Sequence, residues 1–335
     1  MAIARRTFLK ASGAAPAGVM LDVEAQAQGR AVVNLQLGWL SSGNQIGEIC
    51  AKQLGYYEQE GLELRIQAGG PNIDGVAIVA SGRFEIGQVS SSPSLMLATS
   101  QDLPIRCFAA GAQEHPFSYI SRAGRPVREP RDLIGKKIGT QSTAVILLRA
   151  LLAKHNIAEN QVTIIPIGSD MSPLMTGQVD VITGWLTNTT ALRVIPDPVV
   201  LRLWDTGVRL YALPYYATVQ TVERRADVLA RFLRATGRGW AFAHANRGQA
   251  VDMLVREFPN LNRADELVAA DVMLQYAFSP KTAAEGWGTM DPAVWREQID
   301  LYAQLGQFTR RTPRLEEVMT MDILRMTNGQ RPLIG

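Results

Sequence analysis

The chain has 335 residues, of which 47% are hydrophobic and 19% charged, and its 34 Lys and Arg against 31 Asp and Glu give a formal net charge of +3. This composition is too apolar and too evenly charged for a disordered chain, and the length suffices for one large or two medium domains. Two cysteines exclude a disulfide scaffold and a cysteine-rich metal site, and no run of about 18 apolar residues predicts a membrane span. No basic stripe accompanies the small positive excess, so we expect no nucleic-acid partner.

Residues 1–27 have the features of an export signal. Arg5-Arg6 precedes Phe8-Leu9-Lys10, residues 11–21 are weakly apolar, and Ala25-Gln26-Ala27 fits a small-x-small cleavage site. The arginine pair resembles a twin-arginine signal, which predicts a bacterial protein that is exported to the periplasm and not embedded in the membrane. A disordered tail with a chance arginine pair is the alternative.

Apolar β-rich runs alternate with helical patterns along the rest of the chain. Continuous rather than alternating apolar strands are typical of mainly parallel sheets that are covered on both faces, so the sequence predicts an α/β fold. We expect strands at 32–38, 62–67, 84–89, 105–110, 117–122, 137–139, 162–167, 179–183, 199–203 and 216–222, and helices at 45–59, 73–81, 92–101, 142–155, 225–246, 248–258, 264–276, 292–305 and 315–326.

The long helical C-terminal part needs a surface to cover, and we expect it to return to the first sheet. The first lobe would then be discontinuous, with residues 31–120 and 216–335, and the second would hold residues 121–215. Two crossings would join the lobes, near Ser121 and near residues 211–215. In open α/β sheets, ligands bind beyond the carboxyl ends of the strands, so we expect the site in a cleft between the lobes.

Aromatic residues stand at the ends of expected strands and at the crossings. Trp39 and Trp185 follow strands of opposite lobes, where their flat faces would sandwich a ring and add about 0.5–1.5 kcal/mol per contact beyond burial. His115, preceded by Glu114 at the first crossing, would hydrogen-bond a ring nitrogen, and Tyr215 would line the cleft at the second. The alternatives are that both tryptophans are packing anchors, that His115 is a structural histidine, and that Tyr215 packs at the hinge.

Polar loops after the strands supply candidate hydrogen-bond donors. Free N–H groups at a helix start suit a carboxylate, sulfonate or carbonyl oxygen, and glycine lets the backbone approach a ligand closely. Helix capping or an ordinary loop is the alternative in each case. These candidates are Ser41, Ser42, Asn44, Gly69, Ser90, Ser91, Thr140, Gln141 and Ser142.

The sequence predicts no cofactor, no metal and no catalytic residue. Residues 139–143 lack the lysine of a P-loop, and no Gly-x-Ser-x-Gly or His-Glu-x-x-His motif occurs. His155 and His244 stand in helical runs without partners at metal-ligand spacing. Cys50 and Cys107 are expected to be two buried thiols rather than a bridge.

Four segments resemble the periplasmic solute-binding proteins of the nitrate, sulfonate, taurine and hydroxymethylpyrimidine importer group. They are residues 55–64, 79–87, 132–139 and 177–181, in the order and spacing of that group. The resemblance implies a two-lobed periplasmic-binding-protein fold of type II. It further implies a monomer that closes on a small ligand and presents it to the permease subunits of an ABC importer.

Two details resemble the pyrimidine branch of this group. Trp39 follows the first strand, and residues 184–188 read Gly-Trp-Leu-Thr-Asn, which makes Asn188 a further candidate for ligand contact. Thr189 replaces the glutamate of that branch, and Leu40-Ser41 replaces its Pro-Asn. The resemblance therefore favours a heteroaromatic ligand and leaves a sulfonate, taurine or nitrate as the alternative.

Two other functions compete with import. Relatives on the same scaffold that synthesise the pyrimidine carry a cysteine-rich signature, which a chain with only Cys50 and Cys107 lacks, so we expect no enzyme. A sensor module that feeds a signalling partner would have the same sequence features as an importer receptor.

Overall fold

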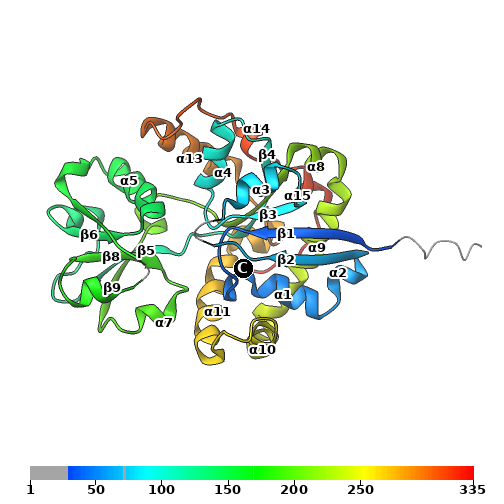
Figure 1. The fold of residues 1–335 in the computed structure, drawn as a ribbon, viewed down its shortest axis with the longest axis horizontal. Helices are drawn as coiled ribbons and strands as arrows, with labels where there is room; N and C mark the ends of the chain where they lie inside the picture. Colours follow the sequence, from blue (N-terminus) through cyan, green and yellow to red (C-terminus); the bar gives the residue numbers. More distant parts are fainter. Residues whose placement is uncertain (1–28, 71–72, 169) are drawn as a thin grey trace, which may run out of the picture.

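The structure is a computed structural model that describes residues 29–70, 73–168 and 170–335, so the expected export signal lies outside the described residues. Figure 1 shows a larger body that contains β1–β4 and β10 beside a smaller body that contains β5–β9. Within the described ranges, no helix combines the length and apolarity that crossing a membrane requires.

Each body is built on a mixed five-stranded sheet with a single antiparallel strand. In the first sheet β10 runs against β3 and β4, and in the second β5 runs against β8 and β9. The α/β architecture is therefore confirmed. The strand order of the first sheet is β2 (Leu62–Gln67), β1 (Ala31–Leu37), β3 (Ile86–Gln88), β10 (Ala212–Thr218), β4 (Ile105–Ala112). The strand order of the second sheet is β7 (Thr163–Pro166), β6 (Lys137–Thr140), β8 (Val181–Trp185), β5 (Phe117–Arg122), β9 (Pro198–Arg202).

Helices cover both sheets, and those that follow β10 return to the first sheet, as the sequence predicts. The first body holds α1 (Ile46–Gln53), α2 (Tyr56–Gln59), α3 (Gly75–Ala80), α4 (Pro93–Ser100), α8 (Val219–Arg224), α9 (Ala226–Ala245), α10 (Arg247–Glu257), α11 (Arg263–Ala277), α12 (Pro280–Glu285), α13 (Pro292–Gln304), α14 (Leu315–Val318) and α15 (Asp322–Met326), and the second holds α5 (Val145–Lys154), α6 (Ser172–Met175) and α7 (Thr189–Leu192).

The longest helix, α9, packs closely on α1 through two glycines. A Cβ at Gly239 would lie 2.0 Å from the carbonyl oxygen of Gly47, and a Cβ at Gly47 would lie 2.1 Å from Cδ1 of Trp240. Real side chains do not approach this closely, so the absence of a side chain at both positions sets the distance between the helices.

Several expected elements differ from the structure for local reasons. The helix expected over 45–59 breaks at Gly55, whose φ of 70° ends α1 and starts α2. The strand expected over 216–222 is β10, four residues earlier, and α8 follows it. The helix expected over 315–326 is interrupted at Met319, which forms a bridge with Cys107 of β4.

The chain passes between the two sheets at residues 113–116 and 203–211. We propose lobe boundaries at these crossings. They replace the expected divisions after residues 120 and 215, because each of those divisions would cut through a strand, β5 in one case and β10 in the other.

One apolar core cluster continues from the first sheet into the second. Tyr119 of β5 and Tyr302 of α13 are both fully buried in it, and α13 contacts α5 of the second body. A smaller cluster covers the other face of the second sheet, around Ile120 and Ile182.

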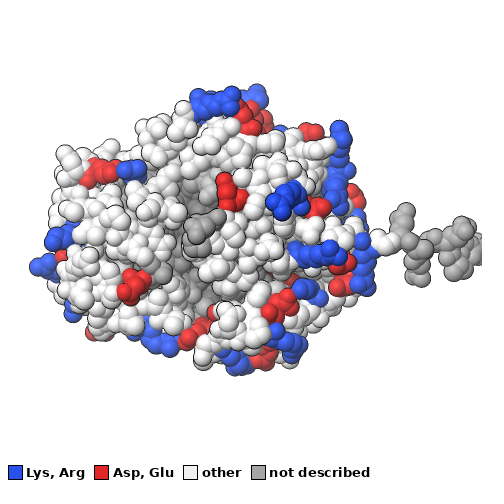
Figure 2. All heavy atoms as spheres, in the orientation of Figure 1, with Lys and Arg blue, Asp and Glu red and all other residues white. Residues whose placement is uncertain are grey.

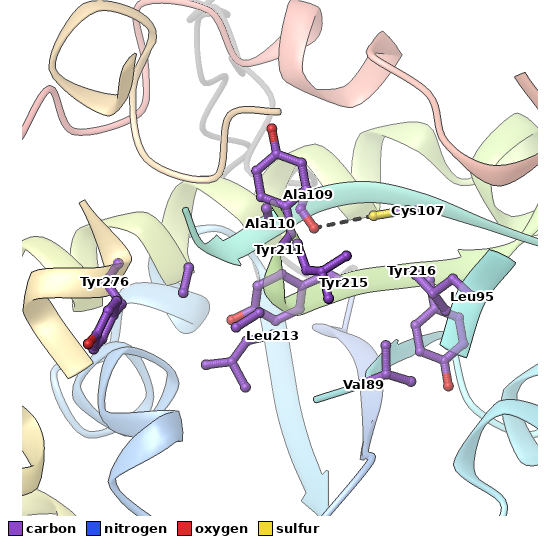
Figure 3. Close-up of a cluster of buried hydrophobic side chains, with 14 of the residues drawn as sticks. Val89, Leu95, Cys107, Ala109, Ala110, Tyr211, Leu213, Tyr215, Tyr216 and Tyr276 are labelled. Atoms are coloured by element: carbon purple, nitrogen blue, oxygen red, sulfur yellow. Dashed lines mark hydrogen bonds between the residues drawn. The ribbon is translucent and has the colours of Figure 1, made fainter. Parts of the chain in front are cut away.

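Figure 3 shows part of the larger cluster, in which Tyr211, Tyr215 and Tyr216 of the second crossing and β10 lie close to β4. The thiol of Cys107 donates to the carbonyl oxygen of Ala109 over 3.5 Å in the same view. Cys50 and Cys107 are both buried and free, which confirms the expectation from the sequence.

Candidate functional site

The strand directions bring the carboxyl ends of the parallel strands of both sheets to the crossings. β4 ends at Ala112 and β5 begins at Phe117, so the carboxyl edge of the first sheet faces the amino end of β5. Because β5 and β10 are the antiparallel strands, the carboxyl ends of β1–β4 and of β6–β9 lie at the two facing edges. Figure 2 shows a furrow between the two bodies, with walls drawn mostly in white and therefore poor in charged side chains.

Trp39 is the most open aromatic residue of these strand ends. Its side chain follows β1 and is 45% exposed, beside Leu40, which is 55% exposed. Gly69, which follows β2, donates its N–H to the carbonyl oxygen of Trp39 over 2.9 Å. A Cβ at Gly69 would lie 2.3 Å from the carbonyl oxygen of Leu37, so this glycine packs two loops together and supports the backbone beneath Trp39.

The loop after Trp39 is ordered by a cap. Ser42 accepts the N–H of Asn44 on its hydroxyl over 3.3 Å, and the Gln45 side chain accepts the N–H of Ser42 over 3.1 Å. The capping role that the sequence offered as an alternative is therefore present at Ser42. Ser41 and Asn44 are half-buried beside it.

The three serines after β3 have different environments. The Ser90 carbonyl oxygen accepts the N–H of Leu213, and Ser91 forms a bridge with Ala212. The Ser91 hydroxyl is buried and has no hydrogen-bond partner among the described residues. Ser92 stands at the N-cap position of α4 but makes no capping hydrogen bond; its hydroxyl donates to the Gln298 side chain over 2.6 Å and so joins the segment after β3 to α13.

His115 lies at the first crossing and is fully buried. Its Nδ1 accepts the N–H of Phe117 over 3.2 Å, which leaves the proton of the neutral ring on Nε2. Burial lowers the pKa of His115 to about 3, so the ring is neutral at physiological pH. Nε2 has no partner among the described residues, and the ring meets the edge of Trp185 at a centroid distance of 4.9 Å.

Glu114 is engaged in a cluster that ties the two crossings together. Its carboxylate pairs with Arg202 at the end of β9. The Arg202 guanidinium also lies 5.1 Å from the ring centre of Tyr276, whose carbonyl oxygen accepts the N–H of Gln113 over 2.7 Å. Glu114 is therefore already paired, and its observed role is to hold the crossings and the end of α11 together.

The candidate ligand contacts of the second body differ in how exposed they are. Thr140 is fully buried and its hydroxyl accepts that of Thr183 over 2.7 Å, so, unlike Nε2 of His115, its polar atom already has a partner. Gln141 is half-buried and Ser142 exposed, at the start of the short helical turn that leads into α5. Asn188 is exposed at the N-cap position of α7.

Tyr215 belongs to a buried polar network under the loop that follows β1, rather than to the furrow. Its hydroxyl donates to Oε1 of Glu48 over 2.6 Å, and the Gln88 side chain donates to the same oxygen over 2.7 Å. Gln45 in turn donates to Gln88 over 2.9 Å. Burial raises the pKa of Glu48 to about 7, although these hydrogen bonds oppose the rise.

Sequence reasoning missed Glu48. Its one signal is its place between Ile46 and Ile49, on the apolar side of α1, where a buried acid needs partners. Those partners, Gln88 and Tyr215, come from β3 and β10, so the sequence alone gives no indication of them.

A surface ion pair joins the two bodies on the side away from α13. Arg193, just after α7, pairs with Asp265 of α11 over 2.6 Å. The guanidinium and the hydroxyl of Thr190 lower the pKa of Asp265, so the carboxylate stays charged. Because Arg193 is 62% exposed at its side chain, water and salt weaken this pair.

The structure therefore brings His115 and Trp185 together at the first crossing. Trp39 and Ser91 lie at neighbouring strand ends of the first sheet, and the aromatic pairs among the described residues include none with Trp39. Tyr215 and Thr140 lie in the interiors of the two bodies.

Comparisons with known proteins give a consistent result. A profile of the family described as NMT1/THI5 like matches residues 42–250, more than half of the chain. The formylaminopyrimidine-binding protein of Halalkalibacterium halodurans is 24% identical over 279 residues, which cover 80% of this chain and 83% of that protein. The riboflavin-binding protein RibY of Chloroflexus aurantiacus is 24% identical over 261 residues, with 72% and 71% covered.

One solved structure and one enzyme complete the comparison. The periplasmic aliphatic sulphonate-binding protein SsuA of Escherichia coli superposes with a TM-score of 0.66 at 14% identity, covering 85% of this chain and 91% of its own, which confirms the fold. The 4-amino-5-hydroxymethyl-2-methylpyrimidine phosphate synthase of Schizosaccharomyces pombe is 25% identical over 144 residues, 42% of this chain and 41% of that enzyme. The resemblance to solute-binding proteins is thereby confirmed.

Proposed function

The chain belongs to the NMT1/THI5-like family, and from this premise we propose that it is a solute-binding receptor that delivers one small organic molecule to an ABC importer. The relatives named as formylaminopyrimidine- and riboflavin-binding proteins each match more than two thirds of the chain. The fold shared with a periplasmic sulphonate-binding protein supports a place in the periplasm. We propose that the receptor acts there as a monomer.

The ligand is a heteroaromatic molecule, and the observation that carries this proposal is the pair of His115 and Trp185. A neutral, fully buried imidazole offers an Nε2 hydrogen that no described residue accepts. A ring nitrogen or carbonyl oxygen would accept it, and Trp185 beside it would contact the ring of the same ligand. Both relatives named above bind molecules that contain nitrogen heterocycles.

The charge around the furrow favours this class over an inorganic anion or a sulfonate. The walls seen in Figure 2 are poor in basic side chains, and the guanidinium of Arg202, at the end of β9, is paired with Glu114 and with Asp205. His115 is neutral at physiological pH, so it supplies a hydrogen bond without a positive charge.

Capture follows from closure of the two bodies on the ligand. Trp39 is exposed on one side of the furrow and Trp185 is half-buried on the other, so a ring held between them would cover both. Ser91 and His115 each hold a buried polar atom without a partner, and a ligand that satisfies them binds the closed form better than the open one.

We propose that the chain has no enzymatic activity. Burial raises the pKa of the Cys50 thiol to about 12 and that of the Cys107 thiol further, so neither provides a thiolate. Both cysteines are buried in the core of the first body.

A thermal-shift screen tests the proposed ligand class. Pyrimidines, flavins, aromatic acids, alkanesulfonates, taurine and nitrate are each added to the purified protein, and hits are measured by calorimetry. A ligand present at 100 times its dissociation constant is expected to add about 2.7 kcal/mol of stability. Stabilisation by heteroaromatic compounds supports the proposal, whereas stabilisation by sulfonates or nitrate alone contradicts the ligand class. Turnover of a bound compound, detected by mass spectrometry, contradicts the receptor function.

Replacement of Trp39 by alanine is expected to weaken binding of the best ligand more than tenfold. The side chain is 45% exposed without ligand, so its loss changes the free energy of unfolding little, whereas a stacked ring would lose its contact area. Leu333→Ala removes a comparably exposed apolar side chain at the C-terminus and serves as the matched control. The affinity of each variant for the ligand is measured by calorimetry. An unchanged affinity in Trp39→Ala would contradict stacking of the ligand on Trp39.

A further inference from the structure

A cavity of about 370 Å³ lies at the edge of the first sheet opposite the strand carboxyl ends. Its wall includes Ile105 and Arg106, the first residues of β4, and Val219, which follows the last residue of β10. Small-molecule sites have volumes from about 300 Å³ upwards. We call it the far-edge cavity, and its charged lining consists of Asp102, Arg106, Arg311, Arg314 and Glu317.

Most of the charges in this lining are paired with one another. Arg311 contacts Asp102 over 2.7 Å and Glu317 over 2.8 Å, and Arg314 contacts Glu317 over 3.1 Å. The backbone N–H of Arg314, which donates to Glu317 over 2.8 Å, and the side chains of Arg311 and Arg314 lower the pKa of Glu317 to about 2, so it remains a carboxylate. The two acids are thus balanced by two of the three arginines, and the lining keeps one positive charge in excess.

Arg106 carries that excess charge. Its guanidinium forms no hydrogen bond or ion pair with any described residue, and its Nε is buried without a partner. The carboxylate of Asp322 is near enough to feel the charge of Arg106, but its hydrogen bonds go to the Thr320 hydroxyl, at 2.8 Å, and to Arg325. A guanidinium that is half-buried and unpaired is costly, because it has lost water without gaining an acceptor.

The uncharged part of the wall is apolar except for Thr99, whose hydroxyl already donates to the carbonyl oxygen of Leu95 over 2.9 Å. Leu103, Pro104 and Val219 offer no hydrogen-bonding side chains, so they suit the carbon skeleton of a ligand rather than its polar end. A planar carboxylate matches the two parallel N–H groups that a guanidinium presents. We propose that the far-edge cavity binds a small organic carboxylate, with Arg106 as its charge partner and the apolar wall in contact with its body.

This site is distinct from the furrow and does not depend on the proposed transport function. The strands β4 and β10 extend from the far-edge cavity to the two crossings, so the cavity and the furrow lie at opposite ends of the same strands. A variant at Trp39 therefore separates the two sites, because it alters only the furrow.

Calorimetry on the full chain with benzoate, and with neutral benzamide of the same shape, tests the proposal. We expect saturable binding of benzoate, binding of benzamide at least tenfold weaker, and an affinity for benzoate that is unchanged in Trp39→Ala. Arg106→Gln is expected to reduce the affinity for benzoate at least tenfold. Arg310→Gln is the matched control, since Arg310 pairs with Asp102 over 2.6 Å but does not line the cavity, and it should stay within about threefold of the natural chain.

Circular dichroism establishes that each variant is folded. Arg106→Lys, which keeps the charge but loses the fork of N–H groups, is a second test, and it should weaken benzoate binding while leaving the fold intact. The proposal is overturned if benzoate does not bind saturably, if benzamide binds equally well, or if Arg106→Gln binds benzoate as the natural chain does. Inorganic phosphate binding that exceeds benzoate binding and depends on Arg106 overturns the assignment to a carboxylate.

Discussion

Replacing Gly239 by alanine is expected to destabilise the protein by about 2–3 kcal/mol, although alanine is the better helix former by about 1 kcal/mol. The added Cβ would lie 2.0 Å from the carbonyl oxygen of Gly47 and 2.8 Å from the Cβ of Ala51, so α9 and α1 must move apart. Backbone oxygen and a short side chain cannot turn away as a long flexible side chain can. The apolar contacts along the whole interface would then loosen.

Gly248→Ala is the matched control for this prediction. Gly248 lies in α10, and the nearest atom to an added Cβ is a terminal nitrogen of Arg263 at 3.9 Å, so alanine fits there. The control should raise the free energy of unfolding by up to about 1 kcal/mol. Urea unfolding of both variants measures the difference, and equal stabilities would show that the two helices can separate without cost.

Raising the pH from 4.5 to 7 is expected to lower the free energy of unfolding by about 3 kcal/mol through Glu48 alone. Burial raises its pKa from 4.5 to about 7, so in this interval the folded chain keeps a proton that the unfolded chain has released. Stability from this group is complete below pH 4.5, falls as the pH rises, and changes no further above about 7. The direction is opposite to that of carboxylates such as Glu317, whose pKa is lowered and whose contribution is lost only in acid.

The difference between the natural chain and Glu48→Gln isolates this effect. The amide keeps an acceptor for Tyr215 and Gln88 but does not ionise, so its stability should stay flatter over the same interval. Glu297→Gln, at an exposed position of α13, is the control and should leave the slope unchanged. Denaturant unfolding at intervals of half a pH unit measures the slopes, and an equal slope in Glu48→Gln would contradict a buried, protonated acid.

The sequence predicts the alternation of strands and helices because apolar-rich runs such as β1 and β4, interrupted only by Asn34, Gln36 and Arg106, indicate buried strands. It places β10 four residues too late because Pro214 argues against a central strand, and the structure accommodates it beside Leu213, whose φ is 52°.

Some residues of the candidate site can be predicted from the sequence and others cannot. His115 and Trp185 could be selected because each follows or precedes a strand, and the fold brings them into contact. Tyr215 and Thr140 also stand at strand ends, but the direction of a side chain across the sheet decides between furrow and interior, and this depends on register. The network of Glu48 depends on residues that are 40 and 167 positions away, so no local pattern reveals it.

The two bodies are joined differently on their two sides, and this difference determines how they can separate. Beside α13 the contact between the bodies is buried and aromatic and includes Tyr119 and Tyr302. Exposing these side chains to water would cost free energy. Between α7 and α11 it includes the exposed pair of Arg193 and Asp265, which salt screens. We therefore expect the furrow to open on the side of α7 and α11 while α13 keeps its contact with the second body. Raised ionic strength should then increase the population of open molecules.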